Sequence, residues 1–494
     1  MKRLLFLMLL ILCIVSGAAL AETVILLGET ITVDGTPASA DDSAPVYLAC
    51  VAESHGDVPA ALTGLQNRVV TITTAGVYRI SGTAEDVQIS VRAGAEDDVR
   101  LILDGVDITC RTAPAIAVYS ARDPRTAGQY GVVIELAEGS VNRLAGSHTV
   151  RIEETDTKLD GAVTSLVSLG LEGTGSLTVE ADNEGVEVKY GHLTINGGVF
   201  RITAGDDPLN VSEDGVGVLT MNDGYVYSAV RNAPGGEGDG IDSNGWIVFN
   251  GGTAINLAHP ASMDGGIDSD MGSTINGGLI VGAGNMYDPI EADSAQLFMM
   301  LEFTESTDDL LVVTDAEGQP VFAYDFPHDY MYIAFSTPDL VEGATYHVYL
   351  GGEIQGEQQD GLYTSITAYT PGRQLVHGAG VAEQRPMGGM QPPEGFAPGQ
   401  GFGGERPEGF GGGRGSGGEM PEGFDPGQGF GGEMPERFDP SRGFGGEMPE
   451  GFAPGPGFGG MGRGPRGMES SADVATGDFV LTRESCTFSN LTVK

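Results

Sequence analysis

Four short acidic turns recur in the middle of the chain, and each presents carboxylate or amide oxygens around a buried-type aliphatic residue. They are Glu184-Gly185-Val186-Glu187, Asp207-Pro208-Leu209-Asn210, Asp239-Gly240-Ile241-Asp242 and Gly265-Gly266-Ile267-Asp268, the last with Asp264 directly before it. Hard oxygen ligands at this density suit Ca²⁺. The pattern therefore predicts calcium ligands at Glu184, Glu187, Asp207, Asn210, Asp239, Asp242, Asn244, Asp264, Asp268 and Asp270.

Charge repulsion between these turns points the same way. Stacked strands lie about 4.8 Å apart, and like charges at that distance repel by about 3 kcal/mol at an effective dielectric near 20. Lys189 is the only basic residue that adjoins the four turns. Columns of carboxylates must then keep protons or hold cations. The alternative is a solvated acidic face without bound metal.

Aromatic residues near these turns could stack on sugar rings. Trp246, the only Trp, follows Asp242, Ser243 and Asn244, while Tyr225 and Tyr227 have the same parity on one predicted strand and so point the same way. With Lys189 they form the candidate carbohydrate-binding set. The alternative for the aromatic rings is packing between coils.

The sequence predicts no catalytic residue. Neither a Gly-x-Ser-x-Gly elbow nor a His-Glu-x-x-His pair is present. A Ca²⁺-dependent uronate lyase needs a base beside the metal, and the nearby basic residues Lys189, Arg201 and Arg231 sit in no recognisable motif. Enzymatic activity stays open, and binding without catalysis is favoured.

A repeated tetrad predicts the element that positions these turns. Its copies Ile195-Asn196-Gly197-Gly198, Met221-Asn222-Asp223-Gly224, Phe249-Asn250-Gly251-Gly252 and Ile275-Asn276-Gly277-Gly278 follow one another after 26, 28 and 26 residues. That period fits one coil of a parallel β-helix, whose stacked coils form a common core. Leu193, Ile195, Phe200 and Ile202 are the expected inward residues of one coil. A sandwich of antiparallel hairpins would not require such regular spacing.

We therefore expect an all-β chain, a right-handed parallel β-helix followed by a small antiparallel β-sandwich, with a disordered Gly/Pro-rich insertion. The expected divisions are a signal peptide at 1–21, the carbohydrate-binding β-helix at 22–290, the antiparallel β domain at 291–377, the Gly/Pro/Met/Phe insertion at 378–470, and the last strands of the β domain at 471–494. In the insertion Phe recurs every 14 residues from Phe396 to Phe452 among many Pro and Gly residues, which cannot form a packed core.

Composition excludes some partners. The 494 residues include 25 Lys+Arg and 69 Asp+Glu, for a formal charge of -44. Such a surface neither neutralises nucleic-acid phosphates nor favours anionic membranes. Beyond the signal, the three remaining cysteines are Cys50, Cys110 and Cys486. Their spacing allows a Cys50–Cys110 bridge without requiring one, and supports no zinc or redox site.

The chain resembles bacterial carbohydrate-binding, polysaccharide-lyase-like β-helix proteins of the clostridial cellulose- and pectin-binding type. The resemblance rests on 78–83 (YRISGT), 101–108 (LILDGVDI), 238–245 (GDGIDSNG) and the repeated Ile-Asn-Gly-Gly. It implies a right-handed parallel β-helix with bound Ca²⁺ that binds plant cell-wall polysaccharide, and it carries best onto Asp239, Asp242 and Asn244. The Pro of the turn at 207–210 departs from the pattern.

These observations together predict a secreted or cell-surface, Ca²⁺-stabilised protein that binds cellulose or acidic pectin-type chains without catalysis. The alternatives are a Ca²⁺-dependent polysaccharide lyase and a structural cell-surface protein. The expected partner is a polysaccharide, with no nucleic acid and no membrane insertion of the mature chain. The sequence does not specify an oligomeric state.

Overall fold

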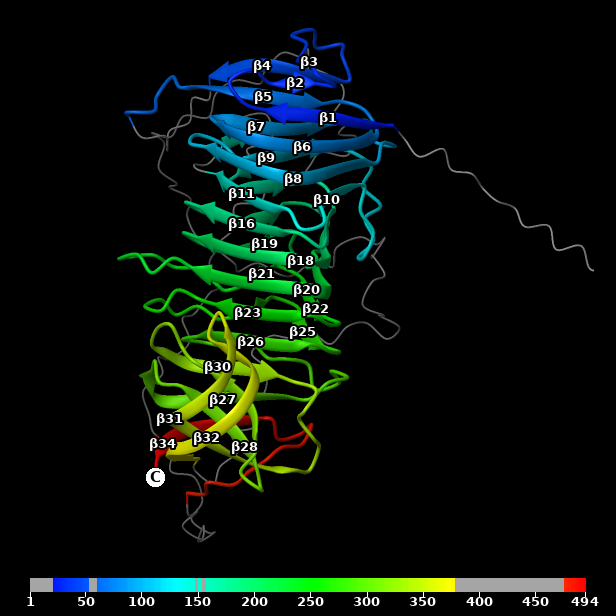
Figure 1. Ribbon diagram of the computed structural model, residues 1–494. Coiled ribbons are helices and arrows are strands. Elements are labelled where there is room, and N and C mark those ends of the chain that lie inside the picture. The colour runs from blue at the N-terminus through cyan, green and yellow to red at the C-terminus, as the bar shows by residue number, and fades with distance from the viewer. Residues whose placement is uncertain (1–20, 53–59, 147–149, 153–156, 378–474) are drawn as a thin grey trace, which may run out of the picture.

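The computed structural model describes residues 21–52, 60–146, 150–152, 157–377 and 475–494, and every regular element in them is a β-strand (Figure 1). The predicted all-β class is therefore confirmed. Within these residues no helix is long and apolar enough to cross a membrane. The predicted signal peptide, apart from its last residue, and the predicted Gly/Pro/Met/Phe insertion lie outside the described residues.

Most strands form a stack of coils with three faces. The first face contains β1 (Glu22–Leu27), β10 (Val132–Leu136), β15 (Leu169–Gly173), β22 (Trp246–Phe249) and β25 (Gly272–Ile275). The second face contains β11 (Val141–Gly146), β16 (Ser176–Ala181), β23 (Thr253–Leu257) and β26 (Leu279–Gly284). Four longer strands bend from the first face to the second: β6 (Gly76–Glu85), β8 (Val99–Cys110), β18 (His192–Ala204) and β20 (Val218–Val230).

The third face is a separate sheet of nine strands. In order along the stack they are β4 (Val46–Ala52), β5 (Gln66–Ile72), β7 (Val87–Arg92), β9 (Ile116–Ser120), β14 (Val163–Ser165), β17 (Val186–Val188), β19 (Leu209–Val211), β21 (Asp242–Ser243) and β24 (Asp268–Ser269). From β5 to β24 each strand pairs in parallel with the corresponding strand of the next coil. On the other two faces the parallel pairings of β8, β10, β15, β18, β16 and β11 close into a ring of six strands, because β8 and β18 take part in both faces.

The repeated tetrad marks the corner between the first and second faces. Its leading residues are direct register partners, Ile195 with Met221, Met221 with Phe249, and Phe249 with Ile275. Along the same corner the amides of the tetrad asparagines form a ladder, with Nδ2···Oδ1 distances of 2.7, 2.8 and 2.8 Å from Asn222 to Asn196, Asn250 to Asn222 and Asn276 to Asn250. Parallel pairing at this register excludes the alternative of antiparallel hairpins. The right-handed winding stays a prediction.

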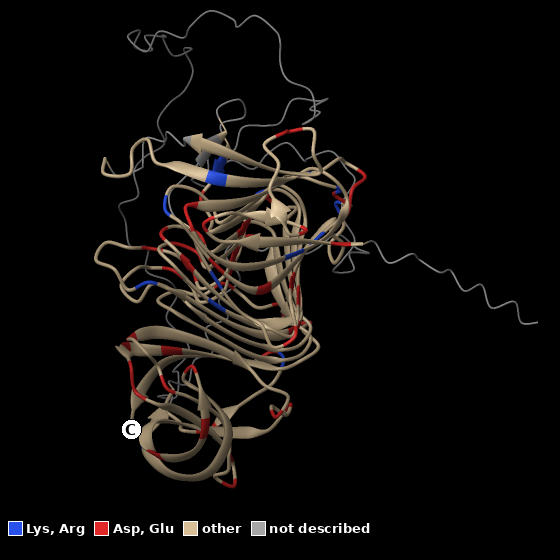
Figure 2. Cartoon of the chain, turned by 45° about the horizontal axis from the view of Figure 1, so that its top comes forward, with Lys and Arg blue, Asp and Glu red and all other residues tan. Residues whose placement is uncertain are grey.

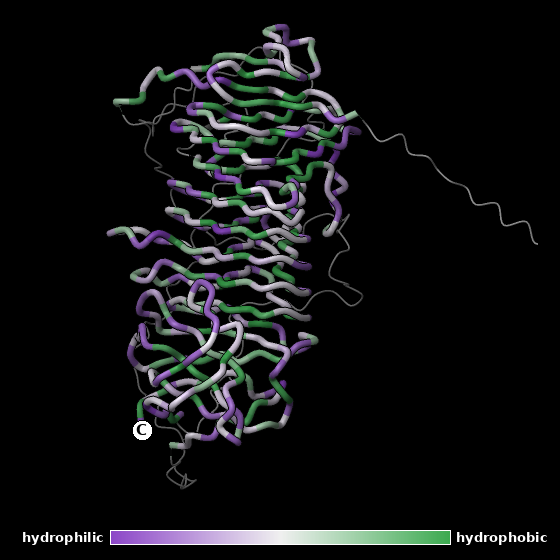
Figure 3. Tube along the Cα trace, viewed as in Figure 1, coloured by the Kyte–Doolittle hydropathy of each residue, from purple (hydrophilic) through white to green (hydrophobic). Residues whose placement is uncertain are grey.

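One apolar core fills the stack from end to end. Hydrophobic residues recur along the strands of successive coils (Figure 3). The predicted inward residues Leu193, Ile195, Phe200 and Ile202 are all buried within it. The corner needs glycine because Gly224 has φ +100° and a Cβ there would lie 2.8 Å from the carbonyl oxygen of Gly198. Two features together hold successive coils in register. Every second side chain of a strand points into the core, and glycine at the corner lets neighbouring backbones approach closely.

Small antiparallel elements accompany the stack. The short strands β2 (Thr32–Val33) and β3 (Thr36–Pro37) pair antiparallel beside β1, and β12 (Val150–Ile152) pairs with β13 (Thr157–Leu159) as a separate two-stranded sheet. No disulfide joins the described cysteines: Cys50 is exposed, Cys110 is buried and Cys486 is half-buried. The Cys50–Cys110 bridge that the spacing allowed is therefore not formed in this structure, where Cys50 lies on β4 and Cys110 at the end of β8.

Antiparallel strands follow the last coil. They are β27 (Phe298–Thr307), β28 (Leu311–Asp315), β29 (Pro320–Tyr324), β30 (Tyr330–Ser336), β31 (Thr345–Gln359) and β32 (Leu362–Val376), joined by β33 (Phe479–Val480) and β34 (Thr487–Val493). β30 pairs antiparallel with β26, so this part continues directly from the stack (Figure 1). β33 and β34 return to pair with β31 and β32. The sandwich arrangement itself stays a prediction.

Candidate metal and carbohydrate site

The acidic turns lie where the chain passes from the second face to the third. The register of the third face places Glu187 beside Asn210, Asn210 beside Asp242, and Asp242 beside Asp268. Each coil therefore adds one oxygen-bearing side chain to a column along the stack, which we call the acidic column. Figure 2 shows acidic residues recurring through the coils, with far fewer basic residues among them.

Three carboxylates converge at this column, two from its members Asp242 and Asp268 and one from Asp239 in the same turn as Asp242. One oxygen from each of Asp239, Asp242 and Asp268 lies within 4.8 Å of the other two, and all three side chains are half-buried. Calcium–oxygen distances of about 2.4 Å place opposite ligands about 4.8 Å apart. The cluster can therefore contribute three ligands to one Ca²⁺ and leave its open side to water or to oxygens of a ligand.

Backbone N–H groups orient the carboxylates of this cluster. Asp239 Oδ1 accepts a hydrogen bond from Gly265 N at 2.6 Å, and Asp239 N donates to Asp207 Oδ1 at 2.7 Å. Asp264 Oδ2 accepts from Gly238 N at 2.7 Å. Because each contact crosses from one coil to the next, the stacking that builds the core also fixes the carboxylates.

Asp288 extends the cluster, and the repeat gave no sign of it. Its Oδ2 accepts a hydrogen bond from Ser269 N at 3.0 Å, and its carboxyl group is hydrogen-bonded to that of Asp268. Asp288 follows the last acidic turn in an irregular segment without a tetrad. The only sequence signal for Asp288 is its position after the final coil. That position does not distinguish Asp288 from an ordinary acidic residue in a loop.

Proton affinity in the cluster is high. Burial, followed by the charge of Asp207, raises the pKa of Asp239 to about 8. Burial and the contact with Asp288 raise the pKa of Asp268 to about 10. Burial and Asp239 also raise the pKa of Asp242 well above its usual range. Carboxyl groups crowded in this way favour either protons or a bound cation over free ionisation.

Lys189 neutralises the N-terminal end of the acidic column. Its Nζ lies 3.0 Å from Asp160 Oδ1 and also contacts Glu187 Oε1. Glu187 is fully buried, and burial raises its pKa to about 8 while Lys189 opposes the rise. The positions that follow Lys189 along the stack are Ser212, Asn244 and Asp270. No ammonium group is therefore repeated beside Asp242 or Asp268.

The other predicted metal ligands lie around this cluster rather than in it. Glu184 is 7% exposed, and its Oε2 accepts no hydrogen bond from the described residues. Asn210 Nδ2 donates to Asp207 Oδ2 at 3.3 Å, and Asn244 Nδ2 donates to Asp214 Oδ1 at 2.8 Å. Asp270 is exposed. Of the predicted set, the structure brings Asp239, Asp242 and Asp268 together at ligand distance.

The four predicted carbohydrate-binding residues do not share a surface. Trp246 lies on the first face, 6% exposed, and packs with Val218, Val248 and Ala127. Tyr225 and Tyr227 lie on the second face and pack against the core of the antiparallel strands. Lys189 lies on the third face in the ion pairs just described. The three aromatic rings pack against other residues of the protein, and this arrangement fits the alternative of packing better than stacking on a sugar.

Basic residues near the acidic column are already paired. Arg201 Nη2 lies 2.8 Å from Asp360 Oδ2, and Arg231 Nη2 donates to Ala181 O at 2.6 Å. Within the described part of the chain, no Lys or Arg forms an ion pair with the three clustered aspartates. The base that a uronate lyase requires beside the metal has no evident counterpart among these side chains.

Comparison with known proteins gives a partial match over the coil stack. Residues 66–296 match a family model described as carbohydrate-binding domain-containing protein, which is fewer than half of the 494 residues but includes the whole acidic column. A carbohydrate-binding domain-containing protein of Acetivibrio thermocellus is 35% identical over 142 residues, covering 28% of this chain and 46% of that protein. The match thus spans less than half of that relative.

A solved structure described as the polysaccharide lyase-like protein from C. thermocellum, in a gadolinium derivative, is also similar. It is 24% identical, covers 53% of this chain and 90% of that chain, and superposes with a TM-score of 0.38.

Proposed function

We propose that this chain is a secreted, non-catalytic carbohydrate-binding protein that holds Ca²⁺ at Asp239, Asp242 and Asp268 and binds acidic cell-wall polysaccharide through that ion. The proposal includes a right-handed parallel β-helix as its scaffold. The observation that carries it is the convergence of three half-buried carboxylates within 4.8 Å, two of which, Asp242 and Asp268, are register partners along a column without a repeated basic partner. The carbohydrate-binding match over residues 66–296 fits this role.

Electrostatics explains why a divalent ion is needed. The chain carries a formal charge of -44, so a uronate polymer approaching the bare acidic column is repelled. A Ca²⁺ ion bound by the three aspartates offsets two of their three negative charges and can accept carboxylate and hydroxyl oxygens of a sugar as further ligands. Binding of pectin-type chains should therefore require Ca²⁺, whereas a neutral chain such as cellulose should not be repelled in its absence.

Secretion is supported by the N-terminal pattern. A basic start, an apolar run and Ala19-Leu20-Ala21 precede β1, which begins at Glu22. In the structure Glu22 forms an ion pair with Arg79, at 2.7 Å from Oε1 to Nε, so the first residue after the predicted cleavage is held against the first coil. The repeat segment at 378–470 is proposed to act as a spacer.

A pull-down separates the alternatives. The mature protein is incubated with insoluble polygalacturonate and with cellulose, in Ca²⁺ and in EDTA, and both retention and unsaturated products are measured. We expect Ca²⁺-dependent retention on polygalacturonate without product. Formation of unsaturated product would establish lyase activity. If the protein is retained on neither polymer, a structural role is favoured.

Asp242→Asn tests the site within the same assay. The substitution removes one charged ligand from the centre of the cluster and should abolish the Ca²⁺-dependent retention. Glu317→Gln, at an exposed turn of the antiparallel part, is the matched control and should bind as the native protein does. Equal retention of both variants would reject the proposed ion site.

A further inference from the structure

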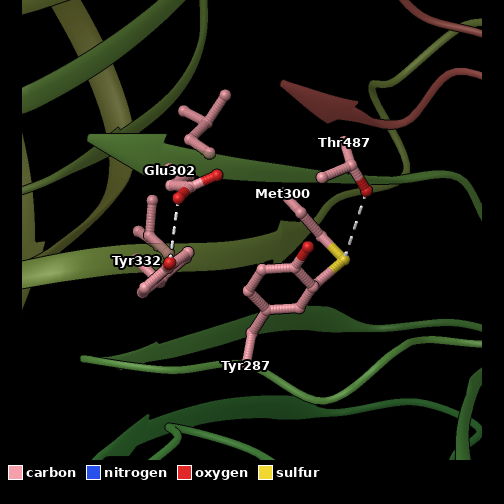
Figure 4. A pocket seen from close by; sticks show the side chains of 7 residues that line it. Tyr287, Met300, Glu302, Tyr332 and Thr487 are labelled. Atoms are coloured by element: carbon pink, nitrogen blue, oxygen red, sulfur yellow. Dashed lines mark hydrogen bonds between the residues drawn. The ribbon is translucent and has the colours of Figure 1, made fainter. Parts of the chain in front are cut away.

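The polar side chains where the last coil meets the antiparallel strands are hydrogen-bonded and closely packed. Tyr332 donates its hydroxyl hydrogen to Glu302 Oε1 at 2.9 Å, and Figure 4 shows both side chains beside Tyr287. The side chains of this junction leave no accessible space between them. Buried polar atoms in folded proteins nearly always have such partners. Asp160 is different, because its buried Oδ1 accepts no hydrogen bond of normal geometry from the described residues.

An amine lies against this oxygen. Lys189 Nζ is 3.0 Å from Asp160 Oδ1 and also contacts Glu187 Oε1. The Asp160 side chain is 10% exposed and that of Glu187 is fully buried, so little water competes for these contacts. A nitrogen held this close to a carboxyl group without a well-directed hydrogen bond is also close to the carboxyl carbon, which is the atom that a nucleophile attacks.

Neighbouring coils hold the three side chains together. Asp160 lies between β13 and β14, Glu187 lies on β17, and Lys189 follows it. β14 and β17 are parallel neighbours. Thr164 Oγ1 accepts a hydrogen bond from Gly161 N at 2.9 Å and lies 3.4 Å from Glu187 Oε2. A Cβ on Gly161 would lie 3.1 Å from the Cβ of Glu187, so glycine lets this turn approach the next coil.

The ion pair is the resting form of this contact. Burial opposes the charge of Lys189, but the charges of Glu187 and Asp160 raise its pKa. Transfer of one proton from the ammonium group to the Asp160 carboxylate replaces two buried charges by a neutral amine and a neutral acid, so it costs less here than in water. Burial raises the pKa of Glu187 to about 8, so this third carboxyl group can take up and release a proton near neutral pH.

We propose that Lys189 and Asp160 join in an intramolecular amide cross-link, with Glu187 as the general acid–base group. After one proton has passed from Nζ to the Asp160 carboxylate, the neutral Nζ attacks Cγ and the N–C bond forms. Glu187 accepts a second proton from Nζ and delivers it to the departing hydroxyl group. The C–O bond breaks, one water leaves, and Glu187 returns to its first protonation state. No oxidant or cofactor takes part, and the fixed contact supplies the proximity that the reaction needs.

The cross-link would join the coil of β14 covalently to the coil of β17. It replaces one buried positive and one buried negative charge by a neutral amide, so the net charge of the acidic column does not change. This inference goes beyond the proposed function, since it requires neither Ca²⁺ nor polysaccharide.

Mass spectrometry of the native mature protein tests the cross-link. The intact mass should be lower than the sequence mass by one water. No Lys or Arg lies between Lys158 and Lys189, so trypsin releases peptide 159–189 from an unlinked chain. An amide on Lys189 blocks cleavage there, and peptide 159–201 less one water is expected instead. Peptide 159–189 at its full mass, without the longer linked peptide, would overturn the proposal.

Three variants identify the linked atoms. Asp160→Asn should lose ammonia in place of water, because the leaving group changes. Lys189→Met should keep the full sequence mass, and a loss of water that persists in this variant would place the change in the backbone at Asp160-Gly161 and overturn the cross-link. Lys158→Arg, at an exposed position on β13, is the matched control and should be linked as the native protein is.

Glu187→Gln tests the acid–base role separately. The substitution keeps the size of the side chain and removes the group that carries the proton, so freshly purified variant should contain at least about tenfold less linked peptide than native protein. The same degree of linkage in both would overturn the role of Glu187. If the variant does not fold, the masses of the native protein and of Asp160→Asn still decide whether the cross-link forms.

Discussion

At the scale of single residues, Lys189 explains why the acidic column differs from end to end. The ammonium group is largely buried between Asp160 and Glu187, with side-chain exposures of 18%, 10% and 0%. Further along the stack its place is taken by Ser212, Asn244 and Asp270. The first part of the column thus carries its own cation, and the part at Asp239, Asp242 and Asp268 is the part that an external cation would neutralise.

Lys189→Met should therefore be strongly destabilising. It leaves two buried carboxylates without their cation, and removal of one partner from a buried ion pair costs about 3–5 kcal/mol. Chemical denaturation should show a loss of about 3 kcal/mol in the free energy of unfolding. Lys158→Met, at an exposed position on β13, is the control and should change it by less than about 0.5 kcal/mol. Equal stability of the two variants would contradict the assignment of Lys189 as an internal counter-ion.

At the scale of elements, the hairpin of β31 and β32 attaches the antiparallel part to the coils. Its turn residue Asp360 accepts hydrogen bonds from Arg201 Nη2 at 2.8 Å and from the Tyr225 hydroxyl at 2.7 Å, 159 and 135 residues away in sequence. The Arg201 guanidinium also lies over the ring of Tyr225, 5.3 Å from its centroid. The turn thus covers Tyr225, one of the tyrosines that the sequence suggested for sugar binding.

Asp360→Asn should loosen this attachment without disturbing the turn. Asp360 has φ +49°, a left-handed conformation that Asn also adopts readily, so the substitution removes mainly the charge. Hydrogen bonds to a charged group contribute about 1.5–3 kcal/mol, less when partly exposed. We expect a loss of about 1–2 kcal/mol in stability and faster amide exchange in β31 and β32. Unaltered exchange rates would show that other contacts hold the hairpin.

The sequence predicted the all-β class and the alignment of the repeated tetrads well because their signal is local and repeated. Ile195, Met221, Phe249 and Ile275 could be aligned from their spacing, and the structure places them in direct register. The same regularity aligned Asp242 with Asp268. These features repeat once per coil, so one sequence contains several copies of the same pattern.

What the sequence missed depends on segments distant along the chain. Asp288 reaches the cluster from beyond the last tetrad, and Ala127 packs with Trp246 on the first face from a loop of an earlier coil. The tip at Asp360 covers Tyr225 in the same way. No periodicity relates these segments to the residues that they contact, so the exposure of the aromatic rings could not be inferred from spacing.

At the scale of the whole molecule, buried and crowded carboxyl groups make stability depend on pH. In the metal-free protein the pKa values of Asp239 and Asp268 are raised to about 8 and about 10, above the usual aspartate value of 3.8. Between these values and their unfolded pKa the native state binds more protons than the unfolded state, so stability falls as pH rises. This dependence of stability on pH has the opposite sign to that produced by an ion-paired carboxylate.

Thermal unfolding in EDTA should therefore give a higher melting temperature at pH 5 than at pH 8. Ca²⁺ requires the ionised carboxylates, so its stabilising effect should be larger at pH 8, where fewer protons compete. We expect Ca²⁺ to raise the melting temperature by several degrees at pH 8 and by less at pH 5. A Ca²⁺ effect that is equal at both pH values would mean that the clustered aspartates are not its ligands.

The most direct test of the account is a calorimetric titration of metal-free protein with Ca²⁺ at pH 8, for the native chain and for Asp242→Asn. The account predicts saturable binding by the native protein and an affinity lower by about one order of magnitude or more in the variant, since one of three converging charged ligands is lost. Absence of saturable Ca²⁺ binding in the native protein, or the same affinity in both, would contradict it.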